Sequence, residues 1–240
     1  MTYQPATISD DPSTLPQLPG WVTSGRAETL ETVAFLSGAA LTVLDQLVSD
    51  PRHGVPVKLV ANRLALSAAT ATSKLEGRLA REVDIRDAYH LTPPGEARGP
   101  DGDLLAFWRD AVRVLAGEIG AIADLVGADF AGEVGVWLDA SLERTRMLGP
   151  LAGCVAVLRA VLDADDRAER VACLLSDVVL ARALNWKQVL PVTAQCLTKA
   201  VLRDLTAEGQ GADLAVEVRI LESVEESIRL ARDLARCAAA

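Results

Sequence analysis

Uncharged residues run without interruption from Thr32 to Leu44, inside a longer pattern of apolar positions at helical spacing that covers about residues 26–48. Apolar residues occupy nearly every side of the helix that this spacing predicts. A helix that is apolar all round is buried in a globular protein. The pattern therefore predicts a central core helix around which the other helices pack.

A second helical pattern covers about residues 56–82, with Pro56 near its first position, where proline is tolerated. Its middle, Leu64 to Ser73, carries no charge and is rich in small residues. Small residues on facing helices permit a close approach. We therefore predict that 26–48 and 56–82 pair antiparallel, with helix continuing, through a possible kink, to about His90.

The clearest interruption of the helical patterns is the Pro- and Gly-rich loop at residues 92–102. Six further helices follow from the apolar spacing and from turn residues. Their predicted ranges are about 101–126, 131–147, 150–162, 165–185, 191–208 and 212–236. Prolines and glycines in residues 1–25 exclude a helix interior there and predict an extended N-terminal arm.

Composition supports an all-α fold. Hydrophobic residues make up 50% of the 240 residues and aromatic residues only 4%, so alanine, leucine and valine must build the core. Alanine and leucine are strong helix formers. We predict one all-α domain over residues 26–240, an orthogonal or irregular bundle of seven to eight helices around the buried N-terminal helix pair. The loop 92–102 is a possible sub-boundary.

The net charge and the cysteines limit which partners and which cellular compartment the sequence favours. The net charge of -9 repels nucleic acid and anionic membrane, so the sequence favours neither as a partner. The four cysteines, Cys154, Cys173, Cys196 and Cys237, have no ligand-like spacing, and the first three sit among apolar residues. No secretory signal and no apolar run of membrane-spanning length is evident. The sequence predicts a cytoplasmic protein with reduced thiols.

Residues 57–75 resemble a helix-turn-helix in part. Apolar positions match the template, and Ser67 and Thr70 lie where a recognition helix would begin. The turn glycine is replaced by Ala65, however, and an alanine-rich stretch without a turn residue favours one continuous helix. A DNA-associated regulator acting through 57–75 stays open as an alternative.

Polar residues are densest between residues 82 and 109, with two more inside the apolar run 171–186. Asp87 could orient His90 for proton transfer, or both could bind a metal. Only one other histidine, His53, exists, so we expect no metal site and no cofactor. The alternative is that these residues form local ion pairs. The candidate binding residues are Arg86, Asp87, His90, Trp108, Arg109, Asp177 and Arg182.

The sequence has no phosphate-binding glycine loop, no Ser-His-Asp set and no nucleophile elbow. No catalytic residues are predicted, and a non-enzymatic role is favoured.

Several stretches together carry a family likeness. The segments are FLSGAALTVLD (35–45), RLALSAATAT (63–72), IRDAYHL (85–91), GPDGDLLAFWR (99–109) and LSDVVLARALNWKQVLP (175–191). With these segments in this order, the chain resembles the bacterial family catalogued as domain of unknown function 1403. The resemblance implies an alphaproteobacterial, often plasmid-borne protein and names no activity. Apart from Trp186, the residues it marks are the candidate binding residues above.

Three functions are compatible with these observations. The first is a helical protein–protein interaction module with an unidentified protein partner, in which a homo-oligomer is possible. The second is a helical enzyme or small-molecule binder using residues 82–109. The third is the DNA-associated regulator.

Overall fold

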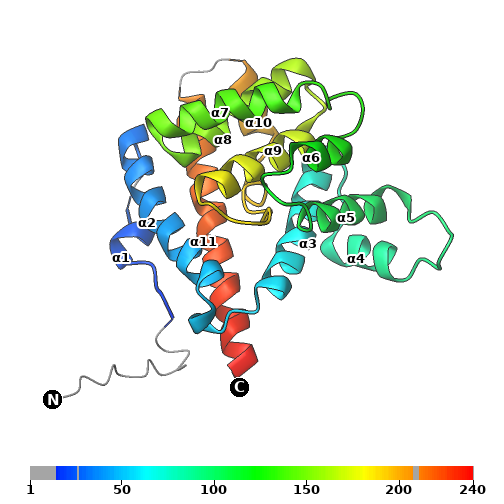
Figure 1. Cartoon of the computed structure of the whole chain (residues 1–240), viewed down its shortest axis with the longest axis horizontal. Helices are drawn as coiled ribbons and strands as arrows, with labels where there is room; N and C mark the ends of the chain where they lie inside the picture. The colour runs from blue at the N-terminus through cyan, green and yellow to red at the C-terminus, as the bar shows by residue number, and fades with distance from the viewer. Residues whose placement is uncertain (1–14, 26, 208–210, 240) are drawn as a thin grey trace.

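The all-α prediction is confirmed. The computed structural model describes residues 15–25, 27–207 and 211–239, and in these ranges it contains eleven α-helices, one 3-10 turn and no strand (Figure 1). One isolated antiparallel bridge joins Leu115 to Gln188. The helices are α1 Gly20–Thr23, α2 Leu30–Ser49, α3 Val57–Leu75, α4 Glu82–His90, α5 Gly99–Ala111, α6 Ile119–Val126, α7 Val134–Leu148, α8 Pro150–Ala164, α9 Glu169–Ala183, α10 Lys199–Thr206 and α11 Ala212–Ala239, with the 3-10 turn η2 at Pro51–His53.

The centre of the core is α9, and the prediction that residues 26–48 form the central helix is wrong. Twelve of the 15 residues of α9 are buried, whereas only seven of the 20 in α2 are. α9 packs against α8, α7 and α3, which cover it on several sides (Figure 1). α2 lies at the edge of the molecule, and its uncharged residues lie partly on a buried side and partly on an exposed side of the helix.

The predicted pairing of residues 26–48 with 56–82 is also wrong. α2 packs along α11, while α3 packs mainly against α5, with smaller contacts to α4, α11 and α9. The N-terminal ends of α2 and α11 line the same pocket, so the two helices run in the same direction (Figure 1). Gly38, expected at a helix contact, is exposed, and a Cβ placed there would meet nothing within 4 Å.

Residues 57–75 form one continuous helix, α3, so the helix-turn-helix reading of this segment is wrong. Threonine hydroxyls bond inside the helix: Thr72 Oγ1 donates to the Ala68 carbonyl at 2.7 Å. The helix then ends at Glu76 and Gly77, where Gly77 has a positive φ of 80°. That reversal separates α3 from α4, which the sequence had joined into one long helix.

The connection from α9 to α10 is irregular and mostly buried, which differs from the helix predicted over 191–208. Asp177 on α9 holds it: its Oδ1 accepts hydrogen bonds from the backbone N–H groups of Val192 (2.9 Å) and Thr193 (2.8 Å). Trp186 Nε1 donates to Asp45 Oδ1 at 2.8 Å and ties the connection to α2. Only Lys199–Thr206 is helical, capped by the Thr198 hydroxyl.

The predicted N-terminal arm is described only from Leu15, and residues 1–14 lie outside the described part. Leu15 and Val22 are buried, and Gly20–Thr23 forms a single helical turn. By length and composition alone, one described helix, α2, would be able to cross a membrane, contrary to the expectation that no segment of that length exists. Core helices of soluble proteins have the same length and composition, so these two properties are weak evidence that α2 crosses a membrane.

Candidate functional site

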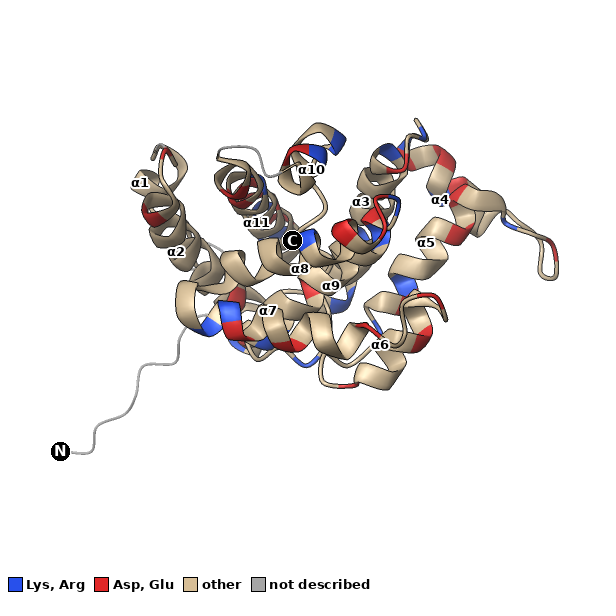
Figure 2. Ribbon diagram, turned by 90° about the horizontal axis from the view of Figure 1, so that it is seen from above, with Lys and Arg blue, Asp and Glu red and all other residues tan. Residues whose placement is uncertain are grey.

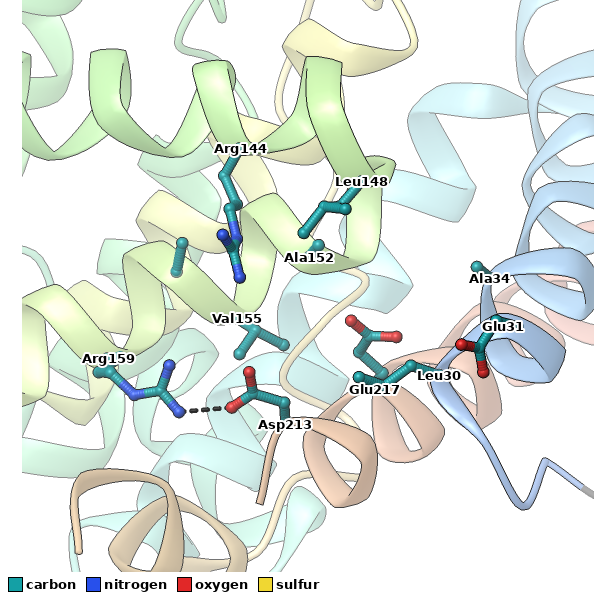
Figure 3. Close-up of a pocket in the computed structure, with 11 residues that line it drawn as sticks. Leu30, Glu31, Ala34, Arg144, Leu148, Ala152, Val155, Arg159, Asp213 and Glu217 are labelled. Atoms are coloured by element: carbon teal, nitrogen blue, oxygen red, sulfur yellow. Dashed lines mark hydrogen bonds and ion pairs between the residues drawn. The ribbon is translucent and has the colours of Figure 1, made fainter. Parts of the chain in front are cut away.

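A pocket opens between the N-terminal ends of α2 and α11 and the facing sides of α7 and α8 (Figure 3). Its volume is ≈ 290 Å³, at the lower end of the range for small-molecule sites. Most of the wall is apolar, and the charged side chains come from all four helices. The lining residues are Leu30, Glu31, Ala34, Arg144, Leu148, Ala152, Val155, Ala156, Arg159, Asp213 and Glu217. We refer to it as the Glu217 pocket.

Glu217 is the most unusual of these side chains. It is only 6% exposed, and its carboxyl group points into the pocket (Figure 3). Its side chain makes no hydrogen bond and no ion pair with the described residues. Burial raises the pKa of Glu217 to about 7, and the nearby negative charge of Asp213 adds to the rise. A carboxyl group without a partner that titrates near neutral pH is a marker of functional sites.

The other charged side chains of the pocket differ in their exposure and in whether they have a partner. Arg159 on α8 forms an ion pair with Asp213 on α11, drawn as a dashed line in Figure 3, so its charge is already compensated. Arg144 is exposed at the rim and has no partner among the described residues. Glu31 is exposed, and hydrogen bonds from its own backbone N–H and the Thr29 hydroxyl lower the pKa of its carboxyl. Glu31 therefore stays ionised at neutral pH.

The geometry suits binding better than covalent chemistry. Leu30, Leu148 and Val155 supply apolar surface beside a single buried acid. The described residues that line the pocket include no serine, cysteine or histidine. Burial raises the pKa of Cys154 to about 12 and holds the pKa of Cys173 well above its usual range, so both thiols are poor nucleophiles.

An exposed apolar surface continues from the pocket along α2. Phe35 is 67% exposed and stacks on Trp21 of α1 with ring centroids 5.2 Å apart, while Trp21 is itself 48% exposed. Figure 2 shows that charged positions are sparse along α2. We define the outer face of α2 by six of its exposed residues: Leu30, Glu31, Ala34, Phe35, Gly38 and Thr42.

Four of the residues predicted from the sequence gather on α4 and α5. Arg86 pairs with Asp87 at 2.9 Å, and both side chains are exposed. The exposed ring of His90 meets the edge of the Tyr89 ring at 5.0 Å, and the Arg109 guanidinium lies 4.9 Å from the same ring. Tyr89 thus connects His90 and Arg109, which the sequence placed on neighbouring elements. The Arg86–Asp87 pair is local to α4, whereas the contact of Arg109 with Tyr89 joins α5 to α4.

The other three predicted residues have separate structural contacts. Trp108 is fully buried, and its Nε1 donates to Thr72 Oγ1 at 3.0 Å. Asp177 is fully buried and holds the α9–α10 connection. Arg182 Nε donates to the Ala116 carbonyl at 2.7 Å, whereas the partners of Asp177 are backbone groups of the α9–α10 connection. The structure gives these residues no common set of partners.

Sequence reasoning missed Arg144, Arg159, Asp213 and Glu217. A signal for Glu217 existed: Ile220, Leu221 and Val224 follow it at spacings of three, four and seven, so it falls on the buried stripe of α11. An acid on an apolar stripe needs a partner or a ligand. No pattern in one helix predicts Arg144, because the pocket brings it from α7.

The described residues contain no group of three or more His, Cys, Asp or Glu side chains suited to a metal ion. A family model described as "Protein of unknown function (DUF1403)" matches residues 6–240, which is nearly the whole chain. No curated protein matches the chain, and no solved structure matches it.

Proposed function

We propose that this chain, which belongs to the DUF1403 family of proteins of unknown function, is a non-enzymatic, helical protein–protein interaction module of the bacterial cytoplasm. Its docking surface is the outer face of α2. The partner is a protein that presents an amphipathic helix with a basic residue at one end of its apolar side. The partner is encoded by the same plasmid or chromosome.

One observation carries this proposal: the stacked pair of Phe35 and Trp21 on the surface. Phe35 leaves two thirds of its side chain exposed, at 67%, next to a tryptophan that is 48% exposed. Aromatic side chains are enriched at the energetic centres of protein interfaces. Beside them, Gly38 and Ala34 offer a shallow surface that a second helix can approach closely.

Charge selects the class of partner. α2 contains no lysine or arginine, and it carries Glu31 at the N-terminal end of its outer face. Glu31 has no cationic partner among the described residues. A second copy of this chain would bring another α2 without a base, on a protein of net charge -9. A partner helix with a lysine or arginine near Glu31 complements the surface better.

The test is site-specific photocrosslinking in the native host. A photoreactive phenylalanine analogue replaces Phe35, and the control places it at Val136, which is 64% exposed on α7. We expect a crosslinked product at position 35 and not at 136, with the crosslink in an amphipathic basic segment of another protein. A synthetic peptide of that segment should bind the purified protein and lose at least tenfold in affinity with Phe35→Ser.

Other occupants give different results. Crosslinks from position 35 to this chain alone, with a concentration-dependent dimer lost in Phe35→Ser, would assign the face to a second copy. Flotation of the purified protein with phosphatidylcholine vesicles, also lost in Phe35→Ser, would assign it to a membrane. Either result, or equal crosslinking at both positions, overturns the proposal.

A further inference from the structure

The Glu217 pocket holds one buried acid that no cation or hydrogen-bond donor of the described residues meets. Arg159, one of the two arginines that line the pocket, is paired with Asp213 (Figure 3). Glu217 is only 6% exposed, and its side chain lines the cavity with no partner among the described residues. A buried carboxylate is stable only when a cation or hydrogen-bond donor meets it.

We propose that the Glu217 pocket binds a primary amine carried on a short apolar chain, with Glu217 as the counter-ion of the ammonium group. The ammonium donates hydrogen bonds to the Glu217 carboxylate. The apolar chain lies against Leu30, Leu148 and Val155, which line the same space. This site is separate from the docking of a protein on the outer face of α2, although Leu30 and Ala34 border both.

An anionic ligand fits the same pocket less well. The two arginines that line it are Arg159, which Asp213 already engages, and Arg144, which is exposed at the rim. Solvent screens a charge at the rim more than a charge inside. An anion inside would meet Glu217 as well as Asp213, whereas an ammonium group meets a carboxylate that lacks a partner.

Binding of an amine is coupled to loss of a proton from Glu217. The charged groups around this carboxyl are Glu31 on α2, Arg144 on α7, Arg159 on α8 and Asp213 on α11. With these in place the pKa of Glu217 is about 7, so a large fraction is protonated at neutral pH. A bound ammonium stabilises the carboxylate and expels that proton. At pH 8.5 the carboxyl is already ionised, while an alkylamine with a pKa near ~10.5, like that of lysine, stays charged.

Isothermal titration of the full chain with hexylamine tests the proposal. Titrations at pH 7.0 in two buffers of different ionisation enthalpy report the protons released. We expect saturable binding with release of a fraction of one proton at pH 7.0 and none from the protein at pH 8.5. Hexanol and hexanoate, which share the apolar chain without the ammonium, should bind at least tenfold more weakly.

Two variants and a control separate the site from the rest of the protein. Glu217→Gln should weaken hexylamine binding at least tenfold and abolish proton release. Glu225→Gln, on the same helix and also partly buried with a raised pKa, should leave both unchanged because Glu225 does not line the pocket. Ala152→Leu should block the cavity and prevent binding while Glu217 remains.

Phe35→Ser should keep hexylamine binding even when it removes the protein partner, so the two proposals fail separately. Stronger binding of hexanoate, lost in Arg144→Gln, would overturn the amine assignment in favour of an anion. Equal binding of hexylamine by wild type and Glu217→Gln, with melting curves that show both folded, would also overturn it, as would no binding at millimolar hexylamine.

Discussion

The indole Nε1 of Trp108 on α5 donates a hydrogen bond of 3.0 Å to the hydroxyl of Thr72 on α3, and both side chains are fully buried. This bond links the α3–α5 contact across the core. Thr72→Val keeps the side-chain shape and removes the acceptor, which leaves a buried indole N–H without a partner. We expect a loss of about 1–3 kcal/mol in the free energy of unfolding, measured by urea denaturation.

A double-mutant cycle with Trp108→Phe isolates the bond. Trp108→Phe removes the donor and also some packing, so it is destabilising by itself. Because the second substitution finds no bond left to break, the double variant should lose less than the sum of the single losses. Additive losses would show that the Trp108–Thr72 bond contributes nothing to stability.

Gly153 on α8 lies close against α7. A Cβ at this position would overlap Thr145 Oγ1 and lie 2.8 Å from the Ser141 carbonyl oxygen. Gly153→Ala should therefore cost about 1–3 kcal/mol of stability. Gly38→Ala is the matched control: it is also inside a helix, nothing lies within 4 Å, and it should be neutral or stabilise by up to about 1 kcal/mol. Thermal melts of both variants distinguish the two sites, and an unchanged Gly153→Ala protein would contradict the packing.

Asp177 acts as an internal cap for the α9–α10 connection. Its Oδ1 accepts hydrogen bonds from two backbone N–H groups. Desolvation raises the pKa of the buried carboxyl to about 7. Asp177→Ala leaves both N–H groups without an acceptor and should lower stability by roughly 2–4 kcal/mol. Asp177→Asn keeps an acceptor oxygen and should lose much less. Equal losses in the two variants would show that the hydrogen bonds are not the cause.

The sequence predicted the fold class because apolar spacing and alanine-leucine content are local properties of each helix. It did not predict the packing order. The long uncharged run 32–44 predicted that α2 is the central helix of the core. α9 is nevertheless more buried than α2, although it carries Asp177. A buried acid with backbone partners lowers the apparent hydrophobicity of a helix without exposing it, so hydrophobicity alone ranked the two helices in the wrong order.

The candidate site was harder to predict for a related reason. The predicted cluster at 82–109 is dense in sequence because its polar residues form local pairs such as Arg86 with Asp87. The Glu217 pocket takes two to four residues from each of four helices, which come from the beginning, the middle and the end of the chain. Only the three-dimensional packing of α2, α7, α8 and α11 assembles it, so a search for neighbouring polar residues does not find it.

Stability should depend on pH through Glu217. Its folded pKa of about 7 lies above the ordinary value of 4.5, so folding favours the protonated form. The resulting penalty is absent below about pH 4.5, grows between pH 4.5 and 7, and is fully present above pH 7. Glu217→Gln removes the penalty and should stabilise the protein by roughly 1–3 kcal/mol at pH 8, with little change at pH 4.5.

Urea denaturation of wild type and Glu217→Gln at these two pH values measures the difference. Asp177, which also has a raised pKa, is present in both proteins and cancels in the comparison. Glu225→Gln gives the comparison: Glu225 lies outside the pocket on the same helix, and burial also raises its pKa, so it reports the pH dependence of a partly buried acid away from the pocket. A stability difference for Glu217→Gln that does not change with pH would contradict the assignment.

The most direct test of the Glu217 pocket is the titration of Glu217 itself. NMR of protein labelled with ¹³C at the glutamate carboxyl carbons follows each side chain with pH, and the resonance missing from Glu217→Gln identifies the right one. An uncompensated acid inside the pocket predicts a pKa of about 7, which falls when hexylamine is added. A midpoint near the ordinary value of 4.5, unmoved by hexylamine, would contradict the account.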